Sequence, residues 1–216
     1  MFVRQRMTAN PFTIAPGVSI PSAEAEMTTR NVRHLPVVED GRVVGVISKN
    51  DIRAALPSKA TTLSAAEATY LVSRLTVAKV MSHPALVISP DALLEEAAVL
   101  MRDKKIEMLP VVEDNTLIGV ITESDILDSF IEILGFREHG TRLTIEAKDA
   151  PGVLAKLTGI TADHHANIQH MAVHRGNLET SIVVVGLNTL NTEAIEADLA
   201  AAGMRVIGKM TNRHDQ

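Results

Sequence analysis

The sequence contains no cysteine and no tryptophan among its 216 residues. Without cysteine, disulfides, thiolate zinc sites and cysteine nucleophiles are excluded, and the default expectation is a reducing compartment, the cytoplasm. One tyrosine and four phenylalanines leave few rings for base stacking. Lys and Arg number 21 against 26 Asp and Glu, with no block of like charge, so we expect no nucleic-acid partner.

Long apolar runs and common catalytic motifs are also missing. The longest charge-free stretch, residues 7–23, contains three prolines, so we expect no membrane segment and no signal peptide. No Walker lysine loop, Gly-x-Ser-x-Gly or His-Glu-x-x-His occurs, so the sequence predicts no enzyme and no catalytic residue. His170 and His174, if both lie on one strand, would be about 13 Å apart. We therefore predict no metal site, and we place His164 and His165 at a helix end, where a cation suits the dipole.

An internal repeat is the main feature that is present. The motif LPVVED occurs at residues 35–40 and again at 109–114, an offset of 74. Held without gaps, this offset aligns residues 7–56 with 81–130 and gives 16 identities in 50 positions. The chain is therefore a duplication.

Each copy predicts a brief entry strand, a helix, a hairpin and a second helix. The entry strands are expected at residues 12–14 and 86–88, each followed by a proline. Two apolar strands flank Asp40-Gly41 in the first copy and Asp114-Asn115 in the second, which is a hairpin signal. The second helices should begin near Asn50 and Ser124. A unit of about 55 residues is too small to be stable alone, so the copies should pack together.

These motifs, above all Leu-Pro-Val-Val and Gly-Val-Ile-Ser/Thr-x-x-Asp-Ile, resemble the CBS-domain family in its usual tandem pair. The resemblance implies a pseudo-twofold module that binds an adenine nucleotide or related adenosyl ligand in clefts between the copies. It implies that Asp51 and Asp125 contact ribose, with Ser48 and Thr122 as hydroxyl partners. We assign Ile47 and Ile121, which precede these hydroxyls, to the same nucleotide site.

The Ser/Thr-x-x-Asp segments also have a purely structural interpretation. A hydroxyl at a helix start accepts an amide hydrogen bond, and an acid three residues later reaches back, which is a capping box. The same helix start could instead offer amides and a carboxylate to a nucleotide. The sequence alone leaves both open.

The copies differ in charge just before the Leu-Pro-Val segment. The first copy has Arg33 and His34, and the second has Glu107 and Met108. A phosphate facing Arg33 and His34 gains charge-assisted hydrogen bonds, whereas one facing Glu107 is repelled, so we predict unequal sites. Lys49 against Glu123 adds to the asymmetry.

The last third of the chain predicts the order βαββαβ, with strands expected at residues 143–147, 168–173, 180–185 and 204–210. This order predicts a four-stranded antiparallel sheet with two helices on one face. The segment DAPGVL at residues 149–154 resembles the ACT-domain family, which implies a small amino acid bound by Asp149, Pro151, Gly152, Val153 and Leu154. The alternative is a tight turn with a helix start, in which Pro151 and Gly152 supply the backbone angles.

The predicted fold class is α+β, a pseudo-twofold tandem CBS module followed by a ferredoxin-like ACT domain. The predicted boundaries are CBS motif 1 at 1–62, a helical connector at 63–76, CBS motif 2 at 77–135, a linker at 136–140 and the ACT domain at 141–216. This architecture resembles the acetoin-utilisation AcuB-like family. We expect a non-catalytic sensor, with an adenine nucleotide as regulatory ligand rather than a cofactor, that forms a homodimer and signals to a partner enzyme. The alternative is a dimerisation scaffold with empty clefts whose ACT domain recruits a partner.

Overall fold

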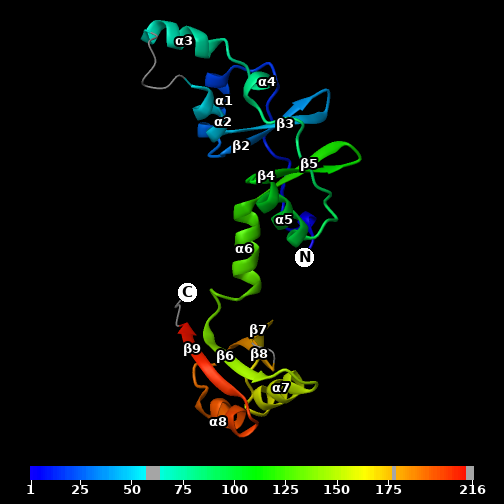
Figure 1. Cartoon of the computed structure of the whole chain (residues 1–216), viewed down its shortest axis with the longest axis vertical. Coiled ribbons are helices and arrows are strands. Elements are labelled where there is room, and N and C mark those ends of the chain that lie inside the picture. Colours follow the sequence, from blue (N-terminus) through cyan, green and yellow to red (C-terminus); the bar gives the residue numbers. More distant parts are fainter. Residues whose placement is uncertain (57–63, 177–178, 213–216) are drawn as a thin grey trace. The chain divides into compact units, whose positions relative to one another are not determined.

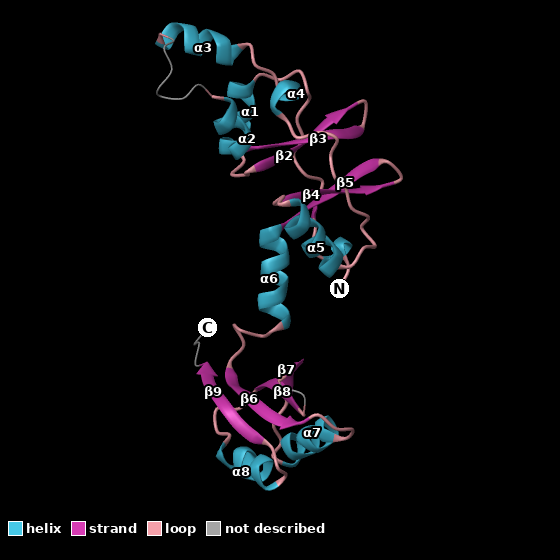
Figure 2. Cartoon of the chain, viewed as in Figure 1, coloured by secondary structure: helices cyan, strands magenta, loops and turns pink. Residues whose placement is uncertain are grey.

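A computed structural model describes residues 1–56, 64–176 and 179–212 of the chain. It divides into two compact units, Met1–Leu127 and Asp128–Gln216 (Figure 1). The predicted boundary between CBS motif 1 and the connector, at 62/63, lies outside the described residues. Helices and strands are both abundant in each unit, as the α+β class predicts (Figure 2). Within the described ranges, no helix has the length and apolar character needed to cross a membrane.

The first unit contains the two copies, each built from a helix, a hairpin and a second helix. The first copy comprises α1 (Ile20–Thr29), β2 (His34–Glu39), β3 (Arg42–Ser48) and α2 (Lys49–Ala55). The second comprises α5 (Leu94–Lys104), β4 (Met108–Glu113), β5 (Thr116–Thr122) and α6 (Glu123–Ile133), whose last turns belong to the second unit. The remaining elements of the first unit are η1 (Val3–Gln5), β1 (Thr8–Ala9), α3 (Ala65–Ser73) and α4 (Val77–Val80).

The hairpins form where the turn residues allow it. Asp40 and Gly41 have φ of 47° and 77°, and Asp114 and Asn115 have φ of 47° and 64°. Positive φ at both central residues is the requirement of the tight hairpin turn whose twist matches the flanking strands. Both hairpins carry a register shift at the same place, between the two valines of Leu-Pro-Val-Val.

The predicted entry strands are shorter than expected. Only a single parallel bridge forms in each copy, from Ile14 to Val37 and from Ile88 to Val111. Both isoleucines are buried in a hydrophobic core, so the apolar pattern is satisfied by one anchoring residue rather than by a strand. Pro16 and Pro90, which lack an amide hydrogen, follow two residues later and do not extend the pairing.

The stretch that precedes each copy packs on the other copy. We call residues 3–10 leader 1 and residues 77–84 leader 2. Leader 1 supplies β1, which pairs antiparallel with β5 of the second copy. Leader 2 contains Ser82, which exchanges two backbone hydrogen bonds with Val46 of β3 in the first copy, at 2.9 and 3.0 Å.

The hydrophobic cores follow this exchange. Val3 of leader 1 is fully buried in the core of the second copy, together with Leu109 and Val111. Val77 of leader 2 is fully buried in the core of the first copy, with Leu35. Each copy therefore completes its core with residues that precede the other copy.

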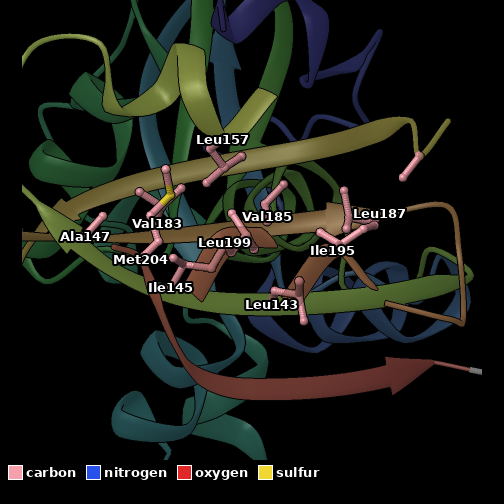
Figure 3. Packing of buried hydrophobic residues seen from close by; sticks show 11 residues of the cluster. Leu143, Ile145, Ala147, Leu157, Val183, Val185, Leu187, Ile195, Leu199 and Met204 are labelled. Carbon is pink, nitrogen blue, oxygen red and sulfur yellow. The ribbon is translucent and has the colours of Figure 1, made fainter. Parts of the chain in front are cut away.

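The second unit has the predicted βαββαβ order. Its elements are β6 (Gly140–Lys148), α7 (Val153–Asp163), β7 (Ile168–Arg175), β8 (Thr180–Leu187), α8 (Glu193–Ala201) and β9 (Arg205–Asn212). The strands form one antiparallel sheet in the order β7-β8-β6-β9. Leu157 of α7 and Leu199 of α8 share one core with inward-facing sheet residues such as Val185, so both helices cover the same face (Figure 3).

On the sheet of the second unit, His170 is enclosed between two glycines. His170 and Gly186 are cross-strand partners in β7 and β8. A Cβ atom built on Gly186 would lie 1.8 Å from His170 Cε1, and one built on Gly135 would lie 2.0 Å from His170 Nδ1. Both ring nitrogens are shielded from solvent and have no hydrogen-bond partner among the described residues. Burial, and secondarily Arg142, lower the pKa of His170.

The predicted linker is held to the same sheet. Arg142 of β6 donates a hydrogen bond to the carbonyl oxygen of Leu134. Asn212 Nδ2 of β9 donates to the carbonyl oxygens of Phe136 and Glu138, at 3.2 and 3.1 Å. The segment between α6 and β6 is therefore an ordered part of the second unit.

The histidines near the end of α7 occupy the position expected of them. His164 is the C-cap of α7, and its Nε2 lies 2.8 Å from Asp198 Oδ2. His165 follows with a positive φ of 55°. Over the described residues, no group of three or more metal-ligating side chains is found.

Candidate functional site

Among the described residues of the first unit, two clefts are lined by both copies, and we name each after the aspartate in its wall. The Asp51 cleft has a volume of about 270 Å³. The Asp125 cleft has a volume of about 500 Å³. Ligand pockets are typically about 300–1,000 Å³, so the Asp125 cleft is within this range and the Asp51 cleft is slightly below it.

The two clefts are related by the repeat. Asp51 and Ser48, from the first copy, face residues 105–108 of the second copy and residues 82 and 84–86, which lie at the end of leader 2 and just after it. Asp125 and Thr122, from the second copy, face residues 31–36 and 8–12 of the first copy and its leader. The leader exchange described above therefore positions the walls of both clefts.

At each acid, the structure contains the capping box. Asp51 Oδ2 accepts hydrogen bonds from the Ser48 amide at 2.8 Å and the Ser48 hydroxyl at 2.7 Å. Asp125 Oδ2 accepts the same two bonds from Thr122, at the same distances. The structure therefore contains the hydrogen bonds that the structural interpretation predicts. It leaves the ligand interpretation open, because each carboxylate is fixed at the wall of a cleft.

Arg33 lies at the wall of the Asp125 cleft. Its Nη2 is 3.4 Å from the hydroxyl of Ser124, the residue before Asp125. The guanidinium of the first copy thus reaches the start of α6 in the second copy. An anion bound beside Asp125 would meet a permanently charged donor there.

Glu107 lies in the Asp51 cleft, near a buried histidine. Glu107 Oε2 is 3.4 Å from His34 Nε2. Burial lowers the pKa of His34, and the attraction of Glu107, which acts in the opposite direction, is the weaker influence. His34 lines both clefts and is held neutral near pH 7, so it supplies no positive charge to a phosphate.

Three sequence-predicted residues lie away from the cleft walls. Ile47 and Ile121 are fully buried in the cores of the first and second copies. Because side chains alternate along a strand, it is their neighbours Val46 and Val120 that line the clefts. Lys49 is not among the described residues that line either cleft.

The leader segments and the two residues that follow each of them are the part of the site that sequence reasoning missed. Residues 8–12 line the Asp125 cleft and include the exposed ring of Phe12. At the equivalent positions of the second copy, residues 82 and 84–86 line the Asp51 cleft and include Leu86. The 74-residue offset pairs these segments, but only the fold shows that each crosses to the other copy.

The predicted amino-acid site of the second unit occupies the turn between β6 and α7. Gly152 is the N-cap of α7 and has a φ of 88°, which glycine adopts without strain. This geometry agrees with the turn-and-helix-start interpretation. Asp149, Pro151 and Leu154 are exposed and Val153 is partly buried, so their role in binding stays a prediction.

Comparisons with known proteins agree with this fold. The CBS domain model matches residues 3–58 and 77–132, and the ACT domain model matches residues 141–203. The chain therefore belongs to the CBS-domain family and carries a tandem CBS pair followed by an ACT domain. Both are regulatory domain types rather than catalytic ones.

Among individual proteins, the chain is similar to CBS domain-containing protein YhcV of Bacillus subtilis, with 31% identity over 124 residues, 57% of this chain and 81% of that protein. It is also 29% identical to an inosine-5′-monophosphate dehydrogenase of Thermoplasma acidophilum, but over only 21% of that enzyme. The first unit therefore resembles a small stand-alone protein and also a segment of a larger enzyme.

Solved structures show the same likeness. AcuB from Vibrio cholerae aligns with a TM-score of 0.52 and 29% identity over 64% of this chain and 96% of that chain. CBSX2, solved with AMP, aligns at 0.50 and 30%, over 61% and 97%. The CBS domain pair of protein MJ0100, solved with 5′-methylthioadenosine and S-adenosyl-L-methionine, aligns at 0.51 and 25%, over 60% and 95%.

Proposed function

We propose that this chain is a non-catalytic sensor that binds an adenine nucleotide or related adenosyl ligand in its CBS clefts. The observation that carries the proposal is that Asp125 and Arg33 line the same cleft, with the Arg33 guanidinium 3.4 Å from the hydroxyl of Ser124, the residue before Asp125. A fixed carboxylate accepts hydrogen bonds from the two hydroxyls of a ribose, and an adjacent guanidinium binds a phosphate. The adenosyl ligands of the two similar structures support this class.

The apolar parts of the cleft suit the base. Leu35, Pro36 and Val120 line the Asp125 cleft beside Phe12. An adenine ring between aliphatic side chains buries apolar area, which is the main source of affinity in such pockets. The polar groups then fix its orientation.

Isothermal titration calorimetry with AMP, ADP, ATP and S-adenosyl-L-methionine tests the proposal. We expect binding of at least one ligand. Asp125→Asn should weaken binding of the phosphate-bearing ligand by about 1–3 kcal/mol, about 5- to 150-fold, because a charged hydrogen-bond acceptor is lost. Glu67→Gln is the matched control, because Glu67 closes the capping box of α3 and does not line either cleft.

Equal weakening by both variants would mean that an effect not specific to the cleft, rather than the loss of a ligand contact, is the cause. No heat from any of the four ligands, with the protein folded by circular dichroism, would contradict nucleotide sensing. It would favour the scaffold hypothesis, in which the clefts stay empty and the ACT domain recruits a partner.

We propose further that the ligand signal is read by a partner enzyme through a homodimer, and that the ACT domain binds a small amino acid at residues 149–154. Allosteric coupling between two such ligands would amount to about 1–3 kcal/mol. Titration of the amino acids with and without saturating nucleotide measures that coupling directly.

A further inference from the structure

Arg33 and Glu107 occupy equivalent positions in the two copies. The amide of Lys49 donates to the carbonyl oxygen of Arg33 at 2.9 Å, and the amide of Glu123 donates to that of Glu107 at 3.1 Å. The backbone at both residues is therefore held in the same way, at the start of α2 and of α6. The difference between the clefts at this position is in the side chain.

The charge of the two clefts differs accordingly. At the three matching positions, the Asp125 cleft has Asn31, Arg33 and Asp125, with formal charges of 0, +1 and −1 and a sum of 0. The Asp51 cleft has their counterparts, with formal charges of +1, −1 and −1 and a sum of −1: Lys105, Glu107 and Asp51. His34 does not offset Glu107, because burial keeps the imidazole neutral near pH 7.

From these observations, and given the function proposed above, we propose that the Asp51 cleft binds an adenosyl ligand without a phosphate, whose 5′ group is cationic. The ribose would meet Asp51, as it would meet Asp125 in the other cleft. The 5′ group would then lie near Glu107, where Arg33 lies in the other cleft. A phosphate there is repelled by the carboxylate, whereas a sulfonium or ammonium group is attracted.

A further feature of the Asp51 cleft supports this ligand class. Lys105 lines this cleft, where the other cleft has the neutral Asn31. A cation and an anion on one wall match a zwitterionic amino-acid group, such as the methionyl part of S-adenosyl-L-methionine.

The test uses the full chain with Asp125→Asn, which weakens ligand binding in the other cleft. The probes are S-adenosyl-L-methionine, the uncharged 5′-methylthioadenosine and AMP, titrated by calorimetry near pH 7.5. We expect the order of affinity to be S-adenosyl-L-methionine, then 5′-methylthioadenosine, then AMP, with at least tenfold between the first and the last. In the same Asp125→Asn chain, Glu107→Gln should reduce the ratio of the affinity for S-adenosyl-L-methionine to the affinity for AMP at least fivefold.

Glu39→Gln is the control, because this exposed hairpin residue does not line either cleft, and it should leave the ratio unchanged. AMP binding as tightly as S-adenosyl-L-methionine in the Asp125→Asn chain would overturn the inference, as would a ratio unmoved by Glu107→Gln. If Asp125→Asn does not fold, Glu107→Gln in the otherwise unchanged chain decides by the same change in ratio.

Failure of the inference is distinct from failure of the proposed function. If AMP binds the unchanged chain but the Asp51 cleft shows no preference for the cationic ligand, only the inference is wrong. If none of the three probes binds the unchanged chain, the proposed function itself is wrong.

Discussion

Gly186→Ala should destabilise the second unit through a steric clash that can be located to one ring. The new methyl group would lie 1.8 Å from His170 Cε1 and 2.2 Å from Nε2, so the imidazole must move. The ring has little room to do so, because Gly135 is packed against it as well. Overpacking of this kind costs about 1–3 kcal/mol. For a unit of this size, that cost lowers Tm by roughly 5–20 °C.

Thermal unfolding of the full chain, followed by circular dichroism, measures this loss. Gly159→Ala is the control: Gly159 lies in α7 with no atom within 4 Å of the new methyl group, so alanine should stabilise the helix by up to about 1 kcal/mol. A double-mutant cycle with His170→Ala then isolates the contact. In the His170→Ala background the penalty of Gly186→Ala should fall below about 0.5 kcal/mol. An unchanged penalty there, or none in the original chain, would refute the clash.

Three further predictions concern stability. Ser48→Ala removes the hydroxyl that caps α2 and should lower the free energy of unfolding by about 0.5–2 kcal/mol in urea titrations. An unchanged free energy of unfolding would mean that the capping box does not stabilise the protein. Val3→Ala should cost about 2 kcal/mol and should destabilise the second copy, as amide hydrogen exchange in β4 and β5 would show, whereas a loss confined to the first copy would contradict the leader exchange. Because the pKa of His170 is lowered on folding, the unfolded chain binds more protons, so stability should fall as pH drops below about 6.5. Urea unfolding at pH 7.5 and 5.5 checks this, and His170→Gln should reduce the difference between the two values; an unreduced difference would assign the pH dependence to other groups.

Local patterns were sufficient to predict most of the fold. The repeat predicted two equivalent copies, and the turn residues at Asp40-Gly41 and Asp114-Asn115 predicted both hairpins, because their backbone angles are determined by the residues themselves. A helix was also predicted in the connector at 63–76, and α3 occupies Ala65–Ser73 of it, with Ser64 and Glu67 forming its capping box. The βαββαβ order of the second unit was likewise predicted from the sequence, and the structure has it.

What the sequence could not predict depends on long-range pairing. Nothing in residues 3–10 indicates that this segment pairs with β5 rather than with its own copy, because strand partners are set by tertiary packing. The placement of Ile47 and Ile121 needed the strand register, since a shift of one residue exchanges the cleft face for the core face. The predicted entry strands failed for the same reason: an apolar triplet does not specify how many of its residues will pair.

The exchange of leaders constrains how such a chain can be divided. A fragment made of the first copy and leader 1 would lack Val77 in its core, and a fragment made of the second copy and leader 2 would lack Val3. The second fragment would also leave β5 without its partner β1. Two separate fragments could complete their cores only by associating, so that the leader of each packs on the copy of the other. Joining both copies in one polypeptide turns that bimolecular encounter into an internal one, at an effective concentration that dilution does not change.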